Sequence, residues 1–202
     1  MGARIQEMVT TIQVGGASGQ VGGAVILLVG FDCFLRTGEM LSLVIDDLIF
    51  AADGTGVVRL EHTKTGRRHA AFEASAINDG LCGRAFRRFT RALPRNTHGQ
   101  NFLFLPKSHK FYKLFDEGLR WLGVDDYGFK PYSVRRGGAT AYFRATRNME
   151  ATLDRGRWSS ARVARIYVND GRAREVELRF SQEIKDRLSL MAAALEEWLR
   201  SP

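Results

Sequence analysis

Cysteine is scarce in this sequence, and so are long apolar runs. Among its 202 residues there are two cysteines, Cys33 and Cys82, which lie far apart and form no CxxC or CxxH spacing. Isolated cysteines of this kind are typical of reduced thiols in an intracellular protein. The longest apolar stretch, residues 24–35, is interrupted by Asp32 and is too short to span a bilayer. Because the residues before it are rich in glycine and carry little basic character, a signal peptide is also disfavoured.

These absences indicate an intracellular protein with no membrane partner. We expect it in the nucleus if its host is a eukaryote, and in the cytoplasm or nucleoid if its host is a bacterium. The sequence also lacks a His–carboxylate cluster of the kind that binds catalytic metal ions. Its adjacent acidic pairs, Asp46-Asp47 and Asp125-Asp126, are more easily explained as turn and cap residues. The sequence therefore disfavours a metal nuclease and predicts neither a metal ion nor another cofactor.

What the sequence does contain is an excess of positive charge. It has 30 Lys and Arg against 22 Asp and Glu, a net charge of +8, and 45% of its residues are hydrophobic, as in a globular protein. Arginine supplies most of the excess and suits bidentate contacts to phosphate. The balance indicates a polyanionic partner, although ribosomal and membrane-surface proteins share it.

The hydrophobic pattern predicts a mainly α-helical protein with one small antiparallel β-sheet. Residues 57–61 are rich in β-forming side chains, and residues 68–72 make a weaker partner strand. Between them, residues 62–67 predict a hairpin turn in which Gly66 can take a positive φ. A glycine-rich stretch over residues 15–23 is interpreted as a linker or mobile loop. Helices are expected over residues 3–13, 24–35, 39–45, 76–93, 108–122, 131–147, 149–157, 160–168 and 173–200.

The last of these helices has the clearest pattern. Its apolar stripe recurs at steps of three or four through Phe180, Ile184, Leu188, Met191, Leu195 and Leu199. A stripe of this length needs a partner, which is either a neighbouring protomer or the helix's own domain. The pattern divides the chain into an N-terminal helix and linker (residues 1–23), a main domain (24–172) and a C-terminal docking helix (173–202).

Four local patterns contain residues that can act on a phosphate group. In the first, Arg36 precedes Glu39 by three residues where one apolar helix ends and another begins, a place where an Arg can bind an anion beside backbone N–H groups. In the second, Lys64 lies in the predicted hairpin turn, from which it can enter a DNA groove and protonate a leaving oxygen. A surface ion pair and an ordinary turn lysine are the alternative explanations.

The third and fourth patterns lie in the predicted helices of the C-terminal half. Arg135 is one turn after Tyr132 on the same face of a helix, and the small residues 137–139 let that helix pack closely on a neighbour. Trp158 precedes a helix that a serine can cap, and Tyr167 follows nine residues later. Taken singly, these are also explained by a basic helix and by core aromatics.

Together, in this order and at these separations, the four patterns resemble the tyrosine recombinase (phage integrase) family. The catalytic domain of that family carries an Arg, a β-hairpin Lys, a His-x-x-Arg motif, a His or Trp, and a nucleophilic Tyr. The residues that match are Arg36, Lys64, Arg135, Trp158 and Tyr167, with Glu39 as a supporting acidic residue. The match runs from about Ala24 to Tyr167, so the main domain is identified as the catalytic domain.

The resemblance implies a site-specific recombinase or integrase that cuts and rejoins double-stranded DNA through a 3′-phosphotyrosyl intermediate without metal. Tyr167 would be the nucleophile and Lys64 the acid for the leaving 5′-oxygen. The two arginines and Trp158 would bind the phosphate. The resemblance also implies that residues 173–200 dock on a neighbouring protomer in a DNA-bound tetramer. Family members usually carry an N-terminal DNA-clamping domain, so the chain is either a fragment or binds DNA with half a clamp.

One residue departs from the family pattern. Tyr132 stands where the family usually has His. A phenol can donate a hydrogen bond to a phosphoryl oxygen, but with a pKa of about 10 it is a poor general base at neutral pH. Two other functions therefore stay open: a DNA-binding remnant that has lost catalysis, and a type IB topoisomerase-like enzyme, which would relax supercoiled DNA without site preference.

Overall fold

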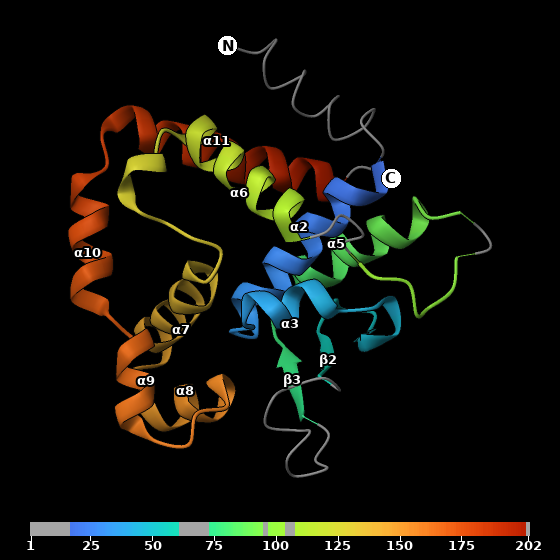
Figure 1. The fold of residues 1–202 in the computed structure, drawn as a ribbon, viewed down its shortest axis with the longest axis horizontal. Helices are drawn as coiled ribbons and strands as arrows, with labels where there is room; N and C mark the ends of the chain where they lie inside the picture. Colours follow the sequence, from blue (N-terminus) through green and yellow to red (C-terminus); the bar gives the residue numbers. More distant parts are fainter. Residues whose placement is uncertain (1–16, 61–72, 95–96, 104–107, 201–202) are drawn as a thin grey trace. The chain divides into compact units, whose positions relative to one another are not determined.

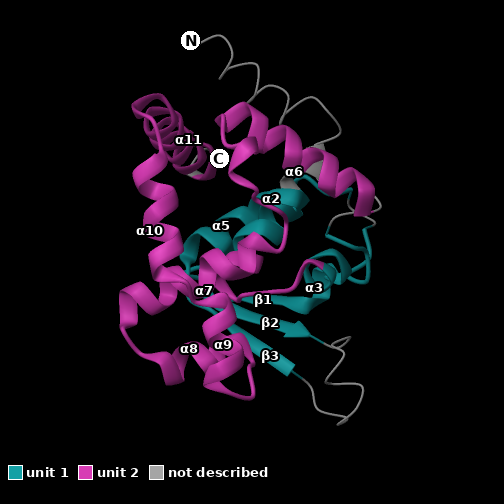
Figure 2. Cartoon of the chain, turned by 60° about the vertical axis from the view of Figure 1, so that its left-hand side comes forward, with its two compact units in different colours: residues 1–29, 38–106 teal, residues 30–37, 107–202 magenta. Residues whose placement is uncertain are grey.

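The computed structural model describes residues 17–60, 73–94, 97–103 and 108–200. This part of the chain is mainly helical with one small antiparallel sheet, as predicted (Figure 1). It folds as two compact units, the first within residues 1–29 and 38–106 and the second within residues 30–37 and 107–202 (Figure 2). The predicted helix over residues 3–13 lies outside the described residues.

The first unit contains the sheet. Its strands β1 (Leu48–Phe50), β2 (Gly56–Leu60) and β3 (Glu73–Ile77) are antiparallel and adjoin in the order β1-β2-β3. Val58 and Leu60 of β2 are buried and alternate with exposed residues, because successive side chains of a strand point to opposite faces. The predicted hairpin turn and its partner strand over 68–72 lie outside the described residues.

The helix predicted over residues 76–93 begins later than expected. Ile77 belongs to β3, where it pairs with Gly56, and the helix α5 spans Gly80–Arg91. Asp79 sets this start, because its carboxylate accepts a hydrogen bond from the Leu81 backbone N–H at 2.8 Å. Ile77 has the spacing of a helical apolar residue but is buried as the end of a strand.

The glycine-rich stretch is not a linker where the structure describes it. Residues 17–23 form the first turns of the helix α2 (Ala17–Asp32). A Cβ on Gly22 would lie 1.8 Å from the backbone oxygen of Leu103, so this glycine allows close packing rather than flexibility. The next helix, α3 (Thr37–Ser42), is also shorter than predicted, and the chain then turns through a 3₁₀ segment, η1 (Ile45–Asp47).

The second unit holds the remaining helices. They are α6 (Ser108–Leu122), α7 (Ser133–Thr146), α8 (Met149–Gly156), α9 (Ala161–Tyr167), α10 (Asp170–Arg179) and α11 (Gln182–Arg200), with a 3₁₀ turn η2 (Asp125–Tyr127). The helices α7, α8 and α9 pack on one another, α10 packs on α7, and α11 packs on α6. Four of them, α6 to α9, lie close to where the sequence predicted helices.

The C-terminal helix predicted over residues 173–200 is instead two helices. Phe180 is extended, with φ −65° and ψ 124°, and separates α10 from α11. Its ring packs edge-on against Tyr127 at 5.3 Å, and the Tyr127 hydroxyl donates to the Arg179 carbonyl at 2.9 Å. These contacts to η2 stabilise the break. Ile184 and Leu199 of the stripe are buried, in the helix that packs on α6 within the same unit.

Neither unit contains a described helix with the length and hydrophobicity needed to cross a bilayer.

Candidate functional site

The helix α7 supplies the framework of the site in the second unit. Its middle is built from small residues, and a Cβ on Gly138 would lie 2.0 Å from the backbone oxygen of Phe31. Ala139, the next residue, is completely buried. The absence of larger side chains therefore brings the segment around Phe31 and Phe34 directly against α7, which confirms the predicted close packing of this helix.

Arg135 enters the interior from α7. Only 2% of its surface is exposed, and its guanidinium donates hydrogen bonds to the carbonyls of Phe34 and, at 2.8 Å, of Gly156. The Phe34 carbonyl lies just after the end of α2, and the Gly156 carbonyl lies at the end of α8. Backbone acceptors at helix ends lack intrahelical donors. The Arg135 guanidinium thus holds the segments at Phe34 and at Gly156 against α7.

Phe34 is held in an uncommon backbone conformation beside this arginine. Its φ is +50°, a region that bulky residues rarely adopt, and it is 1% exposed. Arg155 lies next to it: its guanidinium is 5.6 Å from the Phe34 ring and pairs with the Asp32 carboxylate at 2.7 Å. Strained backbone of this kind persists where the surrounding contacts over-determine it, and it is concentrated at functional sites.

Three aromatic rings stack beside Arg135. The Trp158 ring stacks with the ring of Tyr167, at 4.9 Å and 20°, and with the ring of Phe34, at 6.2 Å and 22°. The Arg135 guanidinium carbon is 4.9 Å from the Trp158 ring and 5.2 Å from the Tyr167 ring, within the range of cation–π attraction. Residues separated by 32 positions in the sequence, Arg135 and Tyr167, are therefore in contact.

Trp158 is placed by the turn between α8 and α9. Gly156 is the last residue of α8, and the residue in the left-handed conformation is Arg157, with a φ of +55°. A Cβ on Gly156 would lie 2.2 Å from the Trp158 ring, so the glycine makes room for the indole. The Nε1 atom of Trp158 is buried and has no hydrogen-bond partner among the described residues, which is uncommon for a buried polar atom.

The other predicted site residues are placed differently. Arg36 is exposed and lies two residues after Phe34, and Glu39 is 9% exposed in the first turn of α3. Tyr132 is half exposed, and its hydroxyl accepts a hydrogen bond from Arg136 at 3.1 Å. Lys64 lies outside the described residues. The structure thus brings Arg135, Trp158 and Tyr167 together, while the roles of the remaining residues stay predictions.

Several side chains that build the site gave no distinctive sequence signal. Arg155 contacts a residue 123 positions away, and Arg136 lies next to Arg135 in a basic run that gives it no separate signal. Thr140 and Arg144 lie on α7 and contact the chain directly after Tyr167. Since each interaction depends on how α7 packs on other segments, local spacing alone does not reveal it.

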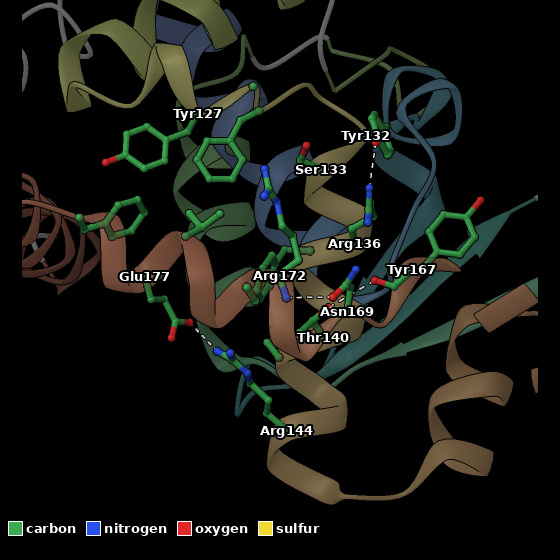
Figure 3. Close-up of a pocket in the computed structure, with 18 of the residues that line it drawn as sticks. Tyr127, Tyr132, Ser133, Arg136, Thr140, Arg144, Tyr167, Asn169, Arg172 and Glu177 are labelled. Atoms are coloured by element: carbon green, nitrogen blue, oxygen red, sulfur yellow. Dashed lines mark hydrogen bonds and ion pairs between the residues drawn. The ribbon is translucent and has the colours of Figure 1, made fainter. Parts of the chain in front are cut away.

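A cavity of about 1010 Å³ opens on this face of the second unit. Aromatic and apolar side chains from α7, α10 and η2 line it together with Arg136, Arg144 and Arg172. Figure 3 shows the Tyr167 ring and hydroxyl directed away from Arg172 and Glu177. In the described part of the chain, no group of three or more His, Cys, Asp or Glu side chains could hold a metal ion.

Comparison with profiles of known protein families found no match, and neither did comparison with curated proteins. Solved structures are similar in fold, among them the following three. Two are complexes of the XerH site-specific recombinase. One is a pre-cleavage complex with its difH substrate (TM-score 0.59, 14% identity, 82% of this chain). The other is a post-cleavage complex with a palindromic difH substrate (TM-score 0.55, 15% identity, 75% of this chain). The third is the Tn1549 transposon integrase with a circular intermediate DNA (TM-score 0.51, 18% identity, 89% of this chain).

These similarities confirm the predicted fold. The chain has the fold of the tyrosine recombinase catalytic domain. It spans 47% and 43% of the two XerH chains and 65% of the Tn1549 integrase chain. Identities of 14–18% establish the fold alone.

Proposed function

We propose that this protein cuts and rejoins double-stranded DNA through a covalent bond to Tyr167, as a site-specific recombinase or integrase. The observation that carries the proposal is the packing of the Tyr167 ring against Trp158 and the Arg135 guanidinium in a chain with the tyrosine recombinase fold. A phenol is a weak nucleophile in water because almost none of it is ionised at pH 7. A tyrosine nucleophile therefore depends on the surrounding groups for activation.

The reaction is a phosphoryl transfer in two matching steps. The Tyr167 oxygen forms a bond to the scissile phosphorus, the bond from phosphorus to the 5′-oxygen breaks, and the phenolic proton is lost to solvent. The departing 5′-oxygen takes a proton from Lys64 and becomes a hydroxyl. A 5′-hydroxyl from another strand then reverses the step and releases Tyr167, which conserves the phosphodiester energy without a cofactor.

The remaining residues act on the charge that grows on the phosphate. Arg36 is exposed and lies two residues after Phe34. In the proposed reaction it binds the non-bridging oxygens of the scissile phosphate, with Glu39 as the supporting acidic residue. Trp158 offers an unused Nε1–H donor. Donors of this kind that are fixed before the reaction stabilise a transition state at little reorganisation cost. Tyr132 adds a hydroxyl at the position of the family's usual His.

The proposed partner is double-stranded DNA, in keeping with the net charge of +8. We further propose that the segment 173–200 joins protomers into a DNA-bound tetramer. In it, Leu178 of α10 is 70% exposed, whereas Ile184 and Leu199 of α11 are buried. Leu178→Glu is therefore expected to reduce assembly on DNA, measured by sedimentation, without changing the stability of the monomer. Unchanged assembly would count against docking through α10.

Trapping the covalent intermediate tests the proposal. A pooled library of nicked duplexes is used, in which loss of a short 5′-hydroxyl fragment prevents the reverse step. We expect a protein–DNA band that resists denaturant and disappears with protease. Tyr167→Phe removes only the hydroxyl and abolishes the band, whereas the control Tyr112→Phe, on a tyrosine that is 46% exposed on α6, retains it. A band that persists in Tyr167→Phe would mean that another residue is the nucleophile.

One observation favours a second candidate, a DNA-binding remnant without catalysis. The Arg135 guanidinium donates to two backbone carbonyls, and the Tyr132 hydroxyl is engaged by Arg136. A protein of this kind binds DNA with the same salt dependence but gives no covalent band in the wild type. A type IB topoisomerase-like enzyme would instead form the band and relax supercoiled DNA without site preference.

A further inference from the structure

The backbone at and directly after Tyr167 is hydrogen-bonded to a side chain of α7. Thr140 is 6% exposed, and its Oγ1 donates to the Tyr167 carbonyl and accepts from the Asn169 backbone N–H, both at 3.3 Å (Figure 3). One hydroxyl therefore satisfies a carbonyl and an amide on either side of Val168. Both hydrogen bonds are partly buried, and leaving a backbone group unpaired in such a place is unfavourable.

A second attachment lies one turn further along α7. Arg144 donates hydrogen bonds from Nε to the Asp170 carboxylate and from Nη1 to that of Glu177, both on α10. The pKa of Asp170 is lowered mainly by its hydrogen bond from Arg144. The same hydrogen bond is the main cause of the raised pKa of Arg144. Thr140 and Arg144 are four residues apart and so share one face of the helix.

These attachments matter because Tyr167 is the last residue of a seven-residue helix. The final carbonyls of a helix lack intrahelical donors, so the end of α9 is prone to fray. Fraying would carry the Tyr167 ring away from Trp158, on which it stacks at 4.9 Å. Contacts that fix residues 167–170 to α7 oppose that movement.

We propose that Thr140 and Arg144 are positioning residues for Tyr167: they hold residues 167–170 on α7 and thereby keep the phenol ring stacked on Trp158 beside Arg135. The inference rests on the proposed function in that Tyr167 is taken as the nucleophile. Neither residue touches the reacting atoms. A displacement of about an ångström can slow a reaction roughly a hundredfold, and loss of one such attachment is expected to slow adduct formation about tenfold.

Fluorine NMR reads the position of the ring without any DNA. The full chain is labelled with 3-fluorotyrosine at its five tyrosines, and Tyr167→Phe identifies the Tyr167 signal by its loss. The stacked indole shifts that signal from the value of free 3-fluorotyrosine. We expect the signal to move towards the free value in Thr140→Val, which loses both hydrogen bonds at almost unchanged volume, and to stay in place in Thr140→Ser.

Arg144→Gln tests the second attachment at a more exposed site, where folding tolerates change, and it should move the same signal. Two controls match these variants. Thr146→Val removes a hydroxyl of α7 that is hydrogen-bonded to the backbone of Tyr142 and Asn148, before Tyr167 in the chain. Arg172→Gln removes one positive charge, as Arg144→Gln does, but from an ion pair with Glu175 within α10. Both controls should leave the Tyr167 signal unchanged.

The rate of covalent adduct formation at saturating DNA completes the experiment. We expect Thr140→Val and Arg144→Gln to lower it about tenfold with the Kd for DNA no weaker than in the matched controls. A Tyr167 signal that stays in place in both variants overturns the positioning role, and so does a moved signal with an unchanged rate. If the signal moves but the wild type forms no adduct, the proposed function fails while the attachment of the segment to α7 stands.

Discussion

Replacing Arg135 with methionine should destabilise the second unit far more than the same change at the next residue. Arg135 is 2% exposed and donates to the carbonyls of Phe34 and Gly156. A hydrogen bond to a charged group contributes about 1.5–3 kcal/mol, and removing the donor also leaves two buried acceptors unpaired. The unfavourable desolvation of the guanidinium offsets part of this. We therefore expect Arg135→Met to lower the free energy of unfolding by about 3 kcal/mol.

Arg136→Met is the matched control. It removes the same charge from the same helix, but among the described residues the Arg136 guanidinium bonds to the exposed Tyr132 alone, so the expected loss is below about 1 kcal/mol. All three tryptophans, Trp121, Trp158 and Trp198, belong to the second unit, so tryptophan fluorescence during denaturant unfolding reports on that unit. Equal losses in the two variants would refute the anchoring role of Arg135.

Three further results are expected. Gly138→Ala places a Cβ about where the Phe31 carbonyl lies and should destabilise the second unit by roughly 1–3 kcal/mol, whereas Gly118→Ala, with no neighbour within 4 Å, should be neutral or stabilising in the same denaturant titration. Arg36→Ala should reduce adduct formation roughly a hundredfold or more with little loss of DNA affinity in a filter-binding assay, and equal losses would favour the binding remnant. Because Arg144 lowers the pKa of Asp170, their ion pair stabilises the fold above the ordinary Asp value of 3.8 and is lost as the pH falls through the lowered value. Acid unfolding should accordingly be less steep in Asp170→Asn, and an identical profile would show that the pair does not contribute.

The class of fold and two of the three stacked aromatic residues, Trp158 and Tyr167, could be predicted from the sequence alone. Helical periodicity placed α6 to α9 close to their observed bounds, since amphipathic and small-residue patterns are local properties. The order and spacing of Arg135, Trp158 and Tyr167 led to the recombinase resemblance, and the structure brings these three into contact.

The division of the chain between elements and the contacts of each arginine depend instead on packing between distant segments. Gly22 lies in a helix and, lacking a Cβ, lets the Leu103 backbone approach closely. Phe180 breaks a helix because Tyr127 contacts both its ring and the preceding carbonyl. Likewise, the Arg135 guanidinium is directed to the Phe34 carbonyl, 101 positions away, and Thr140 to Tyr167, 27 positions away. Interactions over such separations depend on the packing of whole helices, and the periodicity of a single segment carries no information about them.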